Sequence, residues 1–115
     1  MSEVVESIFS KIIRREIPSK IEFENERIVV IHDIAPAAPV HLLVIPKDAQ
    51  YRNVTELAAG APELLAEMVQ IAQEQADLHC NGEYRLVFNT GEAAGQSVFH
   101  VHGHILGNFD HKGIL

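Results

Sequence analysis

The amino-acid sequence predicts an α+β domain with a mostly antiparallel sheet of about five strands. The chain has 115 residues, of which 47% are hydrophobic, and this fits one compact domain over residues 1–115. Two stretches show the apolar period of a helix, and five show the pattern of a strand. Their order is helix, three strands, helix and two strands, and the short connections between strands favour antiparallel pairing.

The first element is a short amphipathic helix near the N-terminus. Its apolar side chains recur at three- and four-residue spacing, at Val5, Ile8, Phe9, Ile12 and Ile13. Cations gather toward its end, where they suit the helix dipole, and Pro18 stops it. Because the run is short and also carries acids, we expect it to pack against the sheet and not to bind a membrane.

Three strands follow this helix. Residues 21–24 alternate apolar and acidic side chains, residues 25–26 favour a turn, and residues 28–31 form a β-branched run, which together predict a hairpin. Two prolines make residues 35–39 a loop, and residues 41–45 form the third strand.

A polar loop then leads to one long helix and two more strands. Pro62 suits the first turn of the helix, and Asn81-Gly82 suits its C-cap. One face of this helix is formed by Leu64, Leu65, Met68, Ile71, Ala72, Gln75 and Ala76. Residues 84–89 and 98–106 are the last two strands, and a loop of small residues, 91–97, joins them.

Charge and cysteine content narrow the class of protein. Nine basic and sixteen acidic residues give a net charge of −7, which argues against a nucleic-acid partner and favours a small molecule. The single cysteine, Cys80, cannot form an internal disulfide, which suits a reducing compartment. Polar residues interrupt any N-terminal signal peptide, and no stretch approaches the ~18 apolar residues of a membrane span. We expect a soluble, cytoplasmic protein with no membrane partner.

The strongest chemical signal is the alternation of His100, His102 and His104. Alternate side chains of a strand share a face, so the three imidazoles are expected to project to one side. The outer two would stand ~13 Å apart, too far to ligate one zinc ion from a straight strand. A metal would need two neighbours and a remote ligand such as His41. The row is better explained as an acid–base and anion-binding surface.

Two further segments point to a phosphate-bearing ligand. Glycines 91 and 95 allow close approach, and the side chains of Gln96 and Ser97 would add donors around a phosphate. Asp33 has two interpretations of equal weight: it accepts hydrogen bonds from ribose hydroxyls, or it is a turn residue before the proline loop.

These motifs together resemble the histidine triad superfamily, and most closely its nucleotide-binding branch of purine nucleoside phosphoramidases. The matching segments are residues 32–36, 39–41, 43–47, 95–99 and the run His-Val-His-Gly-His-Ile-Leu at 100–106. The similarity extends over nearly the whole chain. It implies the fold of that superfamily, with one short N-terminal helix, one long helix and a sheet continued across a homodimer.

The resemblance also implies a mechanism without metal or cofactor. His102 would attack the α-phosphorus of a purine nucleoside 5′-phosphoramidate, such as AMP joined to an amine, and form a covalent nucleotidyl-histidine. The backbone carbonyl of His100 would orient its ring, while His104 and His41 would contact the phosphate oxygens. Water would then release the nucleoside monophosphate.

The nucleotide-binding residues implied by the resemblance surround these histidines. Asp33 would hold the ribose; Ile31, His32, Ile34 and Phe23 would wall the purine; Asn89, Gly95, Gln96 and Ser97 would serve the phosphate and the leaving group. The homodimer would pair residues 62–79 and 83–89 of two chains. The tail at 107–115 departs from the branch, so the branch's leaving-group preference does not carry over.

Three alternatives stand beside this hypothesis. The first is a dinucleoside polyphosphate hydrolase, and the second is a non-catalytic, nucleotide-binding regulatory module. The third is a zinc site with His100, His102 and His41 as ligands.

Overall fold

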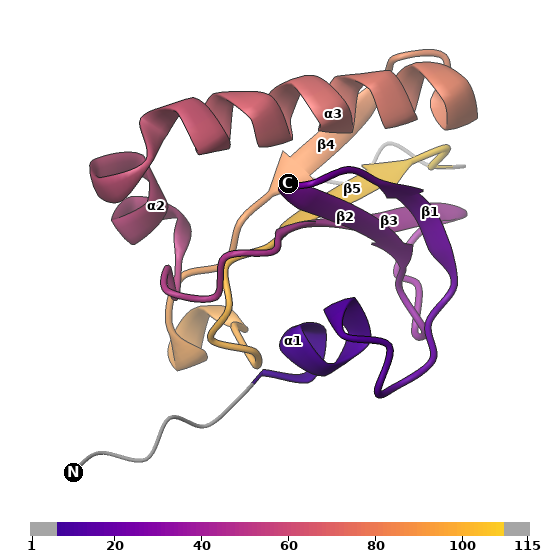
Figure 1. Ribbon diagram of the computed structural model, residues 1–115. Helices are drawn as coiled ribbons and strands as arrows, with labels where there is room; N and C mark the ends of the chain where they lie inside the picture. The colour runs from indigo at the N-terminus through magenta and orange to yellow at the C-terminus, as the bar shows by residue number, and fades with distance from the viewer. Residues whose placement is uncertain (1–6, 110–115) are drawn as a thin grey trace, which may run out of the picture.

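A computed structural model describes residues 7–109 of the chain (Figure 1). Its elements are α1 (Ile8–Ile13), β1 (Ile21–Glu24), β2 (Ile28–His32), β3 (Val40–Pro46), α2 (Val54–Gly60), α3 (Pro62–Cys80), β4 (Tyr84–Val87), the 3₁₀ turn η1 (Glu92–Ala94) and β5 (Gly103–Gly107). Most of the divergent tail, residues 110–115, lies outside the described residues. Within residues 7–109, no helix combines the length and the apolarity that a membrane span requires.

The five strands form one sheet in the order β1-β2-β3-β5-β4. Every neighbouring pair is antiparallel, which confirms the predicted α+β fold. Strands β1 and β4 form the two edges, and β3 pairs with β2 on one side and with β5 on the other.

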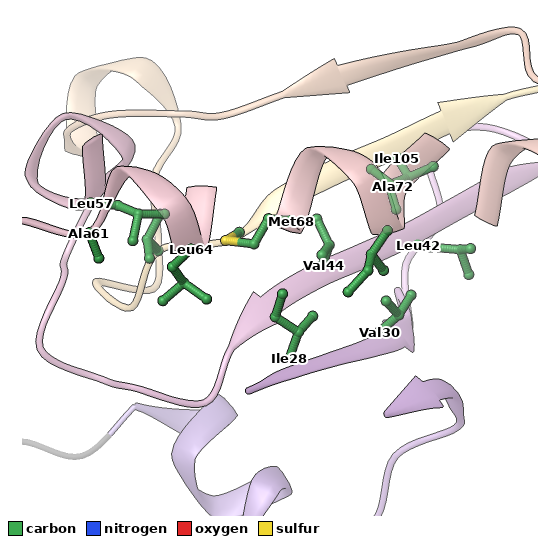
Figure 2. Packing of buried hydrophobic residues seen from close by; sticks show 12 residues of the cluster. Ile28, Val30, Leu42, Val44, Leu57, Ala61, Leu64, Met68, Ala72 and Ile105 are labelled. Atoms are coloured by element: carbon green, nitrogen blue, oxygen red, sulfur yellow. The ribbon is translucent and has the colours of Figure 1, made fainter. Parts of the chain in front are cut away.

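Alternation along the strands divides the core between the two faces of the sheet. Helix α3 covers one face, and α1 lies against the other (Figure 1). On the α3 face, Ile28, Val30, Leu42 and Val44 pack with residues of α3 such as Met68 and Ala72 (Figure 2). On the α1 face, Val29, Ile31, Leu43 and Ile45 pack with Phe9 and Ile12. Alternate residues of β2 and β3 therefore face opposite sides of the sheet.

The ends of the helices follow their local sequence. Helix α3 begins with Pro62 and ends at Asn81 and Gly82, whose positive φ angles of 57° and 77° close the helix as predicted. Helix α1 begins at Ile8 because the Ser7 side chain caps it by accepting a hydrogen bond from the backbone N–H of Ser10.

The expected polar loop before Pro62 contains a helix, α2. Asn53 caps it by accepting from the backbone N–H of Glu56, and Leu57 is fully buried. One buried residue in a seven-residue helix shows no apolar period, so the pattern could not predict this element.

The last two strands are shorter than predicted. Strand β4 ends at Val87, and β5 begins only at Gly103, which pairs with Val44 of β3. Before that point the backbone N–H of Val101 donates to the carbonyl of Tyr51, which takes the chain out of the sheet ladder. His100 and His102 therefore precede the strand in which only His104 lies.

Candidate active site

A hollow of about 340 Å³ opens on the α1 side of the sheet. Seven of the predicted site residues line it: Ile31, His32, Asp33, Ile34, Ser97, His102 and His104. Much of the remaining wall is apolar and comes from α1 and the segment after it, as Ile8, Phe9, Ile12, Ile17 and Pro18. The amphipathic pattern of α1 predicted packing on the sheet, but gave no sign that this helix also walls the site.

Three histidines and one aspartate meet beside this hollow. The ring of His104 lies 5.1 Å from that of His102 and 5.2 Å from that of His41, measured between centroids. His41 Nε2 lies 2.9 Å from His104 Nδ1 and 3.4 Å from Asp33 Oδ2. His41 and His104 share a face because each alternates with residues of the α3-side core, on β3 and β5.

The hydrogen bond of His102 fixes which of its ring nitrogens carries the proton. Its Nδ1 lies 2.8 Å from the backbone carbonyl of His100, and a carbonyl only accepts, so Nδ1 carries the proton. Nε2 then keeps a bare lone pair in the neutral ring. Burial lowers the pKa of His102, which favours this neutral form.

The same reasoning assigns the protons of His41 and His104. His41 Nδ1 accepts from the backbone N–H of Ala37 at 2.9 Å, so the neutral ring carries its proton on Nε2 and donates it to His104 Nδ1. His104 is thereby left with an Nε2–H. Burial, with smaller effects of His102 and His41, lowers the pKa of His104 to about 4, so this ring is neutral at neutral pH.

Asp33, His41 and His104 also hold ligand atoms within 4.8 Å of one another, close enough for a metal ion. A histidine that binds a metal donates a hydrogen bond from its second ring nitrogen. His41 does the reverse, because its Nδ1 accepts from Ala37. These hydrogen bonds oppose metal binding at the cluster.

His100 lies beneath the site and does not line the hollow. It is only 1% exposed; its Nε2 lies 2.7 Å from the carbonyl of Pro46 and its Nδ1 lies 2.7 Å from Ser7 Oγ. Both ring nitrogens are thus occupied, which also opposes the alternative of a zinc site with His100 as a ligand. The expectation that three imidazoles line one open surface holds for His102 and His104 only.

The glycine loop adopts the expected backbone but uses Gln96 differently. Gly91 and Gly95 have positive φ angles of 92° and 95°. The Gln96 side chain donates to the carbonyls of Arg52 and Val98 and accepts from the N–H of Gly91, at 2.6, 3.0 and 2.9 Å. It is therefore buried as a support of the loop and does not offer its side-chain donors to a phosphate.

Ser97 stands where two hollows meet. It lines the hollow beside His102 and also a second one, of about 470 Å³, formed with Glu92, Gly95, Gln96 and Phe99. The turn interpretation of Asp33 is confirmed, since its Oδ1 accepts from the backbone N–H of Ala35 at 2.8 Å.

Phe23 and Asn89 are not at either hollow, whereas His32 is at the first one. Phe23 packs against the α3-side core, because an irregularity in the β1–β2 register between Ile21 and Phe23 reverses the alternation. His32 lines the first hollow, and its imidazole is bonded to Glu22, at 2.7 Å. Asn89 follows β4 and lines neither hollow.

Comparison with known proteins agrees with this fold. A family profile described as scavenger mRNA decapping enzyme C-term binding matches residues 6–114. A HIT-like protein of Synechocystis is 46% identical over 89% of this chain and 90% of its own. The purine nucleoside phosphoramidase of Escherichia coli K12 is 39% identical, over 95% of this chain and 98% of its own. A solved HIT family hydrolase from Clostridium thermocellum has 43% identity and a TM-score of 0.89, over 98% of this chain and 99% of that one. With full-length relatives and a shared fold, the chain belongs to the histidine triad (HIT) family.

Proposed function

We propose that the protein hydrolyses purine nucleoside 5′-phosphoramidates, with His102 as the nucleophile. One observation carries this proposal: the bare Nε2 of His102 belongs to a ring that lines the hollow beside His104, whose Nε2–H is a neutral donor. A lone pair next to a donor suits attack on phosphorus with stabilisation of the phosphate oxygens. The similarity to a phosphoramidase of E. coli supports the same substrate class.

The hollow suits a nucleotide as a whole. Its apolar wall from α1, with Ile31 opposite, offers a surface for a planar base. Asp33 keeps part of its acceptor capacity after the bond to Ala35, and we assign this capacity to the ribose hydroxyls. Ser97, at the junction of the two hollows, would stand between the phosphate and the leaving amine.

The reaction would proceed in two steps. His102 Nε2 forms a bond to the α-phosphorus while the P–N bond breaks, and the amine leaves with the electron pair and takes up a proton. Water then attacks the phosphorus of the nucleotidyl-histidine, releases the nucleoside monophosphate, loses a proton to solvent and restores His102. The His104 donor would act on the phosphate oxygens in both steps.

The test is hydrolysis of an AMP–amine conjugate, with adenosine monophosphate release and the mass of acid-quenched protein as readouts. Wild type should gain the mass of one adenylate, and His102→Ala should lose both this adduct and at least about 1000-fold in rate. His79→Ala is the matched control, because His79 lies on α3 and lines neither hollow. Full activity in His102→Ala would refute the proposal, and tight monophosphate binding without turnover of any substrate would indicate a binding module.

A further inference from the structure

Two hydrogen bonds, joined through residue His100, connect His102 to a group outside the hollow. The connection begins at Ser7, the N-cap of α1, passes through the ring of His100 and ends at the His100 carbonyl that holds His102 Nδ1. Neither Ser7 nor His100 lines the hollow, so neither is placed to touch a ligand there.

The ring of His100 has one consistent arrangement of its proton. Its Nε2 lies 2.7 Å from the carbonyl of Pro46 and must donate to it. Burial lowers the pKa of His100, so the ring is neutral and its Nδ1 is bare. A bare, buried nitrogen needs a donor, and Ser7 Oγ, at 2.7 Å, is the group in position to supply one.

The Ser7 hydroxyl is itself held in place by α1. It accepts from the backbone N–H of Ser10 at 3.0 Å, and Ser10 Oγ lies 3.3 Å away. Its proton has two acceptors within reach, Ser10 Oγ at 3.3 Å and His100 Nδ1 at 2.7 Å, and the shorter contact assigns it to His100. Two residues later, Phe9 packs edge-on against the rings of His100 and His102, with centroids 5.8 and 4.9 Å apart. The first turn of α1 thus contacts both rings.

We propose that Ser7 is a positioning residue for the reaction: its hydroxyl anchors the His100 ring, and thereby the His100 carbonyl that keeps the proton of His102 on Nδ1. His100 is held at both nitrogens, between α1 and the last residue of β3. Without the Ser7 donor, one side of this anchor is lost, and the carbonyl and the His102 ring become less well fixed. The inference rests on the proposed role of His102.

The key variant is Ser7→Gly, because glycine is accepted at helix N-caps almost as well as serine while it removes the hydroxyl. We expect kcat for the AMP–amine substrate to fall about 3- to 10-fold with KM unchanged, the loss expected for one hydrogen bond. Ser7→Thr keeps a hydroxyl at the cap and should restore kcat to within about twofold of wild type. Ser10→Ala is the control on the same turn, since it leaves the Ser7–His100 contact in place and should not change kcat.

A spectroscopic readout separates this inference from the proposed function. Nitrogen-15 NMR of the histidine rings should show His100 protonated at Nε2 and His102 at Nδ1, and Ser7→Gly should shift the Nδ1 signal of His100. These signals do not depend on turnover, so they test the link even if His102→Ala shows that the nucleophile was misassigned. Wild-type kcat in Ser7→Gly, failure of Ser7→Thr to rescue it, or an Nδ1–H on His100 would each overturn the inference.

Discussion

At the scale of single residues, the site depends on where three imidazole protons lie. A backbone carbonyl fixes the proton of His102, and a backbone N–H fixes that of His41 and, through it, that of His104. These two backbone groups thereby leave a lone pair on Nε2 of His102 and an N–H donor on Nε2 of the neighbouring His104. The neutral state of all three rings follows from burial, which lowers the pKa of each.

These lowered pKa values predict the acid side of the pH–rate profile. The proposed attack requires neutral His102, and a lowered pKa means that this form persists at pH values below the ordinary imidazole pKa of about 6.5. We therefore expect kcat/KM for an AMP–amine substrate to stay level as the pH falls to about 6.5, and to drop only below it. Steady-state rates in buffers of constant ionic strength measure this profile, and an acid limb centred above pH 6.5 would contradict the neutral, buried assignment.

At the scale of elements, the sequence predicted what depends on repeated patterns. The period of α3 and its Asn81-Gly82 end, the β1–β2 hairpin and the antiparallel sheet were all predicted from the sequence. What it could not predict depends on single contacts: Leu57 is the one buried residue of α2, and the bond from Val101 to Tyr51 delays β5.

The site shows the same distinction between residues placed by sequence motifs and residues placed by single tertiary contacts. The family motifs placed His102, His104 and Asp33 at the hollow and His41 against it. His41 and His104 lie in β3 and β5, while Asp33 and His102 stand next to the ends of β2 and β5. The structural use of the Gln96 side chain, the anchoring by Ser7 and the displacement of Phe23 depend on tertiary contacts that no local spacing encodes.

The register irregularity in β1 gives a prediction that separates Phe23 from the nucleotide. Phe23 packs on the α3 side, so Phe23→Leu should reduce the free energy of unfolding by about 1–2 kcal/mol and leave KM unchanged. Ile31 lies on the α1 side and lines the hollow, so Ile31→Ala should raise KM as well as destabilise the fold. Chemical denaturation and steady-state kinetics measure the two effects, and a raised KM in Phe23→Leu would show that this ring contacts the base.

At the scale of the whole molecule, the sheet has an edge that another chain could extend. Among the described residues, β4 pairs with β5 only, which leaves its outer side open to pairing. Next to it, α3 carries Val69, a large apolar side chain that is 42% exposed. Glu67 contacts Arg27 and Asn25, so its side of α3 faces the β1–β2 end of the sheet. Val69 is two residues further along, which is about half a turn around the helix, so it lies on the opposite flank of α3, toward β4.

We therefore predict a homodimer in which β4 and this flank of α3 meet their counterparts across a two-fold axis. Analytical ultracentrifugation should give twice the 12.8 kDa mass of one chain. A charge in the centre of such an interface is costly, so Val69→Glu should weaken the dimer by at least about tenfold. Leu78→Glu is the matched control: Leu78 is 74% exposed but lies nine positions on, half a turn around the helix, away from β4. A wild-type chain that sediments as a monomer, or equal weakening by both variants, would show that the sheet ends at β4 or continues elsewhere.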